Sequence, residues 1–283
     1  MRQTLLSVFL VTALSPPAAA DELRSLSSGF DGPDALAGWS EHLPTGFTRK
    51  WREPRIEDGR LVLQPLSSGW YEDNQAGHLY HPVAGDFIAT TRIEVTGTDA
   101  ALPQTPFSLA GLFIRAPRGV SAATWAPGQE NWLFFSIGTA APAGEPHYEI
   151  KTTTNSLSTL KILPSPTGPV DLRIARHGEL FTLLARQPGG DWQVKDQMIR
   201  PDLPETLNVG LTAYADYGSV APIYPDFQRY NTQGAVEEKA DLIAYVDSFA
   251  LRRPTTGRIP VANLDAPDFL EAITARRADL LSD

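Results

Sequence analysis

Residues 69–95 read GWYEDNQAGHLYHPVAGDFIATTRIEV and say more about the fold than any other stretch of the chain. An aromatic and acidic cluster comes first, followed by a glycine turn, a short strand and a Gly85-Asp86 turn. After that turn, apolar and β-branched residues alternate with polar ones from Phe87 to Val95. A period of two is typical of a strand with one buried face. This order predicts one sheet of a β-sandwich.

Short apolar runs between glycine and proline turns extend in both directions from this stretch. Asp58-Gly59 leads into one of them and is a strong hairpin signal. The number of runs, about ten to twelve, and the absence of βαβ alternation predict an antiparallel all-β protein. Further strands are expected at 59–63, 110–116, 131–137, 148–153, 170–176, 179–186, 207–214 and 241–251.

The first twenty residues predict a signal peptide. Arg2 is followed by an apolar run over 5–14 that is too short to span a bilayer, and Ala18 to Ala20 form a small-residue cleavage site. We therefore expect a periplasmic or secreted protein with no membrane insertion after cleavage. The chain has no cysteine, which favours a bacterial exported protein over an animal extracellular module. Its net charge of −9 disfavours nucleic acid as a partner.

The rest of the chain divides into a sandwich over 21–254 and a linker with a short helix over 255–283. Asp265 is a good N-cap, and apolar residues such as Phe269, Ile273 and Leu280 recur at helical spacing. Within the sandwich, 117–129 and 217–239 are expected to be long loops, which are usually functional or mobile.

The motifs of the sandwich occur in an order that resembles a known family. The chain resembles the concanavalin A-like lectin/glucanase superfamily, in the form found at the C-terminus of glycoside hydrolase family 43 β-xylosidases, and is similar to the bacterial domain of unknown function 1349. This resemblance implies a jelly-roll β-sandwich. It does not predict xylosidase activity, because the expected signal peptide runs almost directly into the sandwich. The matching pieces are Gly29–Gly32 with Trp39, Asp58–Leu61, Gly85–Phe87, Ala110–Arg115, Asn131–Leu133, Asp171–Ile174, Gly210–Leu211 and Val246–Phe249.

Strand alternation places several large side chains on one face of a sheet. Arg115, Trp132 and Tyr214 share this face, with Trp70 and Tyr71 at its side. If the face is concave and open, it predicts a groove in which sugar rings stack on aromatic rings. If loops cover it, the same residues are simply packed. Only the first alternative requires these rings to reach solvent.

The cluster from Trp70 to Asn74 also has two interpretations. Trp70 and Tyr71 offer ring faces, while Glu72, Asp73 and Asn74 offer groups that bind hydroxyls. The cluster predicts either a ligand site or a loop fixed by bonds between side chains and backbone.

Two aspartates near the ends of the sandwich raise the question of a metal. Asp31 and Asp247 lie by the first and last strands, where a structural calcium is one alternative and hydrogen bonding in turns is the other. No other cofactor is expected.

No catalytic signature stands out, and the Glu-x-Asp-x-x-Glu motif of some active glucanases is absent. The sequence therefore predicts an exported, non-catalytic protein that binds carbohydrate. One alternative is a glycan-active hydrolase or lyase with acids from separate strands, and another is a structural or adhesion protein without a small ligand. The candidate acids are Glu72, Asp73, Glu149 and Asp216.

Overall fold

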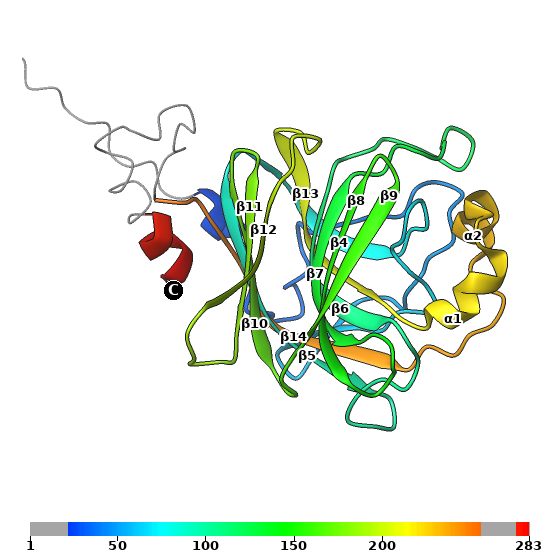
Figure 1. Ribbon diagram of the computed structural model, residues 1–283, viewed down its shortest axis with the longest axis horizontal. Helices are drawn as coiled ribbons and strands as arrows, with labels where there is room; N and C mark the ends of the chain where they lie inside the picture. Colours follow the sequence, from blue (N-terminus) through cyan, green and yellow to red (C-terminus); the bar gives the residue numbers. More distant parts are fainter. Residues whose placement is uncertain (1–21, 256–275, 283) are drawn as a thin grey trace, which may run out of the picture.

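Two antiparallel seven-stranded sheets face each other across the core (Figure 1). The computed structural model describes residues 22–255 and 276–282. Within them the predicted all-β sandwich is confirmed, with short helices added at its edges. The signal peptide expected over 1–20 lies outside the described residues, as does most of the helix expected in 255–283.

One sheet, which we call the loop-covered sheet, contains the strands on which the aromatic face was predicted. All of its pairings are antiparallel. In spatial order its strands are β1 (Ser40–Glu41), β4 (Gly77–Ala84), β13 (Thr206–Tyr214), β6 (Ser108–Arg115), β7 (Trp132–Thr139), β8 (Pro146–Thr154) and β9 (Leu157–Pro164).

The other sheet, which we call the opposite sheet, contains the long alternating strand that follows the Gly85-Asp86 turn. Its order is β12 (Gln193–Ile199), β11 (Leu180–Arg186), β10 (Val170–His177), β5 (Phe87–Gly97), β14 (Leu242–Arg252), β3 (Arg60–Leu63) and β2 (Arg55–Glu57).

The Asp58-Gly59 hairpin forms as predicted. Glu57 pairs with Arg60, and the two residues between them have φ values of 51° and 72°. Both lie in the left-handed region, as a two-residue type I′ turn requires, and aspartate and glycine tolerate it best. The turn fixes the register of β2 against β3.

Strands β6 and β7 are buried along their whole length. On one face, residues such as Leu112 and Phe135 join the core between the two sheets. On the other face, Phe113, Trp132 and Phe134 belong to a separate buried cluster. The alternation predicted from sequence is therefore correct, but both faces of these strands are covered.

Helices cover part of the outer face of the loop-covered sheet. The segment 217–239, predicted to be a loop, instead contains α1 (Tyr217–Val220), η2 (Ala221–Ile223) and α2 (Phe227–Gln233), at the right of Figure 1. Val220, Ile223 and Tyr230 form a small core of their own. The Tyr230 hydroxyl accepts a hydrogen bond from the Gly69 N–H at 3.0 Å. This bond ties the helices to the loop over 69–76, which contains Trp70 and Tyr71 and which we call the aromatic loop.

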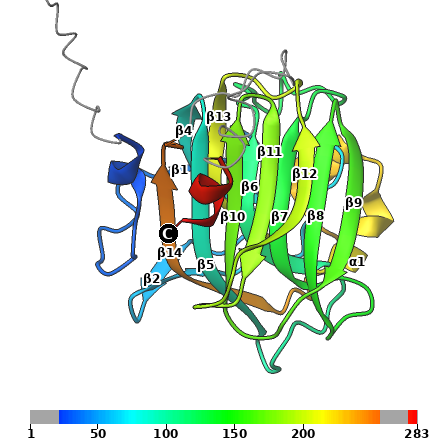
Figure 2. The same ribbon diagram turned by 60° about the vertical axis from the view of Figure 1, so that its left-hand side comes forward.

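The chain ends on the opposite sheet. Residues 276–281 are helical, and Leu280 packs in a cluster with Ile88, Leu184 and Trp192. Figure 2 shows this helix against the strands of that sheet. The predicted packing of a C-terminal helix on the sandwich is thus confirmed for its described part. No helix among the described residues is long and apolar enough to cross a membrane.

Candidate binding site

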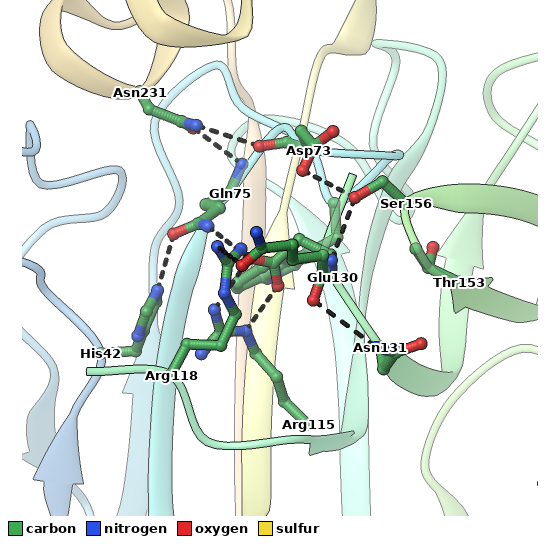
Figure 3. A network of polar contacts seen from close by, with 12 residues as sticks. His42, Asp73, Gln75, Arg115, Arg118, Glu130, Asn131, Thr153, Ser156 and Asn231 are labelled. Atoms are coloured by element: carbon green, nitrogen blue, oxygen red, sulfur yellow. Dashed lines mark hydrogen bonds and ion pairs between the residues drawn. The ribbon is translucent and has the colours of Figure 1, made fainter. Parts of the chain in front are cut away.

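A buried carboxylate lies beneath the aromatic loop and organises its surroundings (Figure 3). Glu130 accepts hydrogen bonds from Arg115 Nε at 2.9 Å, Arg118 Nη1 at 2.5 Å and Gln75 Nε2 at 2.9 Å. Burial alone would raise the pKa of Glu130, but the two guanidinium groups hold it below its usual value. Arg115 is itself fully buried in this network, so it holds the loop from below and lines no open groove.

Asp73 fixes the loop from its other side. Its carboxylate accepts hydrogen bonds from Ser156 Oγ at 2.7 Å and from the Gly128 N–H at 3.0 Å. The Asn231 side chain donates to the Asp73 carbonyl at 2.9 Å and accepts from the Gln75 N–H at 3.0 Å. Burial raises the pKa of Asp73. For this residue the structure supports the loop-fixing alternative.

The three largest rings of the predicted aromatic face are covered. Trp70, Trp132 and Tyr214 are each 0% exposed. The Trp70 indole donates to Thr212 Oγ1 at 3.0 Å, and its ring centroid lies 4.5 Å from that of Phe113. Trp70 thus packs onto the strands where an open groove was one expectation. Alternation identified the shared face, but it could not show that the chain's own loop lies on it.

A small pocket remains open beside Trp70. Its volume is about 110 Å³. The Tyr71 ring lies 5.9 Å from the Tyr217 ring and 6.1 Å from the Tyr224 ring, measured between centroids. Tyr71 and Tyr217 are half-buried, and Tyr224 is 41% exposed, so phenol rings do reach solvent here. The lining residues are Tyr71, Phe107, Lys151, Leu160, Tyr214 and Tyr217.

The floor of the pocket rests on a buried polar cluster. Lys151 Nζ lies 3.0 Å from Glu149 Oε1 and donates to Tyr214 Oη and to the Trp70 carbonyl. Tyr214 Oη donates to Glu149 Oε1 at 2.7 Å. Burial lowers the pKa of Lys151, and burial together with Glu149 raises the pKa of Tyr214 well above its usual value. All three ammonium protons therefore have acceptors.

Glu72 directly follows Tyr71, which lines the pocket, and its charge is felt by Tyr217, which also lines it. The Glu72 φ of 53° is left-handed, and its N–H donates to Ser158 Oγ at 2.6 Å. Glu72 Oε2 accepts a hydrogen bond from the Tyr224 hydroxyl at 2.8 Å, which is the main reason that the pKa of Tyr224 is raised. Of the five residues predicted over 70–74, Tyr71 and Glu72 are half-buried, while Trp70, Asp73 and Asn74 are buried.

Several residues of the pocket had no signal in the sequence. Phe107, Leu160 and Tyr217 come from three separate segments that meet only in the folded chain. For Lys151 the sequence could predict only that it shares a strand face with Glu149, because one residue separates the two.

The four acids of the enzymatic alternative are held separately. Among the described residues, each makes its hydrogen bonds to different groups, so no two of them form a bonded carboxylate pair. Their partners include Tyr224 for Glu72, Ser156 for Asp73, Lys151 and Tyr214 for Glu149, and Ser67 for Asp216.

The calcium alternative also finds little support. The first segment does pair with the last strand, through Ser28 and Phe249. Asp31 is exposed, and Asp247 is half-buried where the register of β14 shifts. In residues 22–255 and 276–282, no group of three or more His, Asp or Glu side chains is placed to hold a metal. Calcium at Asp31 and Asp247 stays a prediction.

Comparison with known proteins shows the fold. No family model matches the chain, and no curated protein is significantly similar to it. A functionally unknown Saccharomyces cerevisiae protein is 13% identical, with a TM-score of 0.54 over 77% of this chain and 98% of that one. The GH43 protein BlXynB from Bacillus licheniformis is 12% identical, with a TM-score of 0.53 over 84% of this chain and 40% of that one.

A third structure has the same architecture. Xylan β-1,4-xylosidase from Bacillus halodurans is 14% identical, with a TM-score of 0.51 over 80% of this chain and 39% of that one. Sequence identities this low are evidence for a shared fold and not for a shared function. The similarity to the bacterial domain of unknown function 1349 stays a prediction. The chain is a β-sandwich of two antiparallel seven-stranded sheets, and its fold is similar to that of these three structures.

Proposed function

We propose that this chain is an exported, non-catalytic protein that binds carbohydrate in the tyrosine-lined pocket. One observation carries the proposal: Tyr71 and Tyr217 line an open pocket, and the Tyr224 ring next to Tyr71 is bonded to the carboxylate of Glu72. A sugar ring has an apolar C–H face that packs on an aromatic ring, and hydroxyls that hydrogen-bond to a carboxylate. The pocket supplies the rings, and Glu72 next to Tyr71 supplies the carboxylate.

The setting of the pocket supports this proposal. Tyr214 belongs to the buried cluster of Trp70, and Tyr217 packs against the small core of the helices, so these two rings need little ordering when a ligand binds. Two structures of similar fold are a GH43 protein and a xylan β-1,4-xylosidase, and this likeness supports a carbohydrate ligand. A periplasmic or secreted location rests on the predicted signal peptide.

The floor of the pocket does not favour catalysis. Tyr214 is a poor general base at neutral pH, because its pKa is raised well above the usual value and its hydroxyl is already bonded to Glu149. Glu149 is in turn paired with Lys151. These groups are better suited to support the rings above them than to transfer protons.

Affinity gel electrophoresis of the full chain against a panel of soluble polysaccharides tests the proposal. We expect retardation by at least one polymer, and we expect Tyr71→Ala and Tyr217→Ala each to weaken it about tenfold or more. Tyr245→Ala is the matched control, since Tyr245 is a half-buried tyrosine on the opposite sheet.

Two results would count against the proposal. One is a wild-type chain that no polysaccharide retards, and the other is binding that survives both pocket substitutions. Release of reducing ends or of unsaturated product by the wild-type chain would instead favour the enzymatic alternative.

A further inference from the structure

The size of the pocket limits how much of a glycan it can hold. Pockets that enclose a whole ligand usually measure about 300–1,000 Å³. This pocket measures about 110 Å³, and Tyr71, Tyr217 and Leu160 are among the residues that line it. It therefore has room for a single sugar ring or part of one, not for a run of consecutive units.

Among the described residues that line the pocket, no cation is free to receive an anionic sugar. Lys151 is the one basic residue of this described lining and is 3% exposed. Its ammonium group already contacts Glu149, Tyr214 and the Trp70 carbonyl. A uronate carboxylate would have to displace Glu149 from Lys151, which would leave a buried carboxylate without its counter-charge.

The carboxylate of Glu72, the neighbour of Tyr71 in the chain, is fixed in position. The Glu72 backbone is held in a left-handed conformation by Ser158, and its Oε2 is held by Tyr224. Glu72 Oε1 accepts no hydrogen bond from the described residues and can receive one from a ligand hydroxyl. Burial is the main cause that raises the pKa of Tyr217, and the charge of Glu72 contributes, so its field reaches a residue that lines the pocket.

We infer that the pocket takes one uncharged sugar ring and that Glu72 is the residue that excludes uronic acids. This inference rests on the proposed function and deepens it. A neutral ring can pack on Tyr71 and Tyr217 while a hydroxyl donates to Glu72 Oε1. A uronate in the same position would place a second carboxylate near Glu72, and no free cation among the described lining residues would offset the repulsion.

The test compares matched polymers in affinity gels with the full chain. The probes are hydroxyethyl cellulose, mixed-linkage β-glucan, galactomannan and arabinoxylan, each beside a counterpart that carries carboxylates. For the three hexose polymers the counterpart is oxidised at C6, and for arabinoxylan it is glucuronoxylan. We expect a neutral polymer to be retained, and its acidic counterpart to bind at least tenfold more weakly.

Glu72→Gln then assigns the exclusion to one residue. Glutamine keeps an oxygen that accepts the Tyr224 hydrogen bond but removes the charge, so binding of the acidic polymer should rise about fivefold or more. Glu179→Gln is the control, because it changes the net charge equally at an exposed residue beside the β10–β11 turn of the opposite sheet. It should leave both affinities unchanged.

The outcomes separate this inference from the proposed function. Equal retention of neutral and acidic polymers overturns the inference and leaves carbohydrate binding standing. An acidic polymer that stays excluded from the Glu72→Gln variant overturns the role of Glu72. If no polymer of either kind is retained, the proposed function fails together with the inference.

Discussion

Protonation of His42 should destabilise the protein in mild acid, and His42→Gln should remove that effect. His42 Nε2 lies 2.8 Å from Gln75 Oε1, and Gln75 in turn donates to Glu130 beneath the aromatic loop. Burial, and then the nearby Arg115 guanidinium, lower the pKa of His42 from 6.5 to about 3. The folded protein therefore holds this imidazole neutral at pH values where the unfolded chain protonates it.

The sign and size of the effect follow from these two values. Because the folded pKa lies below the unfolded one, the stabilisation is complete above pH 6.5 and is lost as the pH falls. Each pH unit between the two values is worth about 1.4 kcal/mol, so about 2 kcal/mol is lost by pH 5 and about 5 kcal/mol below pH 3. The pKa of His78 is lowered as well, chiefly by burial, which the substitution leaves in place, and in smaller part by His42 itself.

Urea unfolding of the full chain at pH 7.5 and pH 5.0, followed by tryptophan fluorescence, measures the difference. Glutamine keeps a neutral donor for Gln75 but cannot be protonated. The wild type should lose about 2 kcal/mol more than His42→Gln between the two pH values. If both proteins lose the same free energy of unfolding, then His42 is not held neutral by the fold and the reasoning is refuted.

Three further substitutions test the structure beneath the site. Trp70→Ala should lower the free energy of unfolding by about 3–5 kcal/mol, since it empties the cluster under the loop; a variant of wild-type stability in urea would show that this indole is not packed. Gly77→Ala should cost about 1–3 kcal/mol, because a Cβ there would lie 2.1 Å from the Trp51 indole; an unchanged melting temperature would contradict the close approach. Glu130→Gln leaves the Arg115 guanidinium buried without its counter-charge and should cost about 3–5 kcal/mol in thermal unfolding; a loss below about 1 kcal/mol would mean that water reaches this network.

Local patterns were sufficient for the architecture. The Asp58-Gly59 turn needs only its own two residues to adopt left-handed backbone, so the hairpin can be predicted without knowledge of the rest of the chain. The alternation in 131–137 likewise separates Leu133 and Phe135, in the core, from Trp132 and Phe134, on the outer face. Turn geometry determines the first feature and strand geometry the second.

The candidate site depends on contacts that no local pattern encodes. Alternation assigned Trp132 and Tyr214 to a shared face, but only the fold shows that Trp70 packs over that face. The segment over 217–239 was predicted to be a loop, because its helices are too short to produce a clear period of 3.6 residues. Tyr217 reaches the pocket through one of those helices.

The attachment of the aromatic loop to the sandwich has an evolutionary consequence. Tyr71, Glu72 and Tyr224 belong to no strand, whereas the interior beneath them is closed by Trp70 and by the ion pairs of Glu130. Substitutions at the three outer positions can accumulate without disturbing the scaffold. Related chains could therefore diverge in specificity by exchanging a few surface side chains, and a designer could graft a new recognition segment between the same anchors.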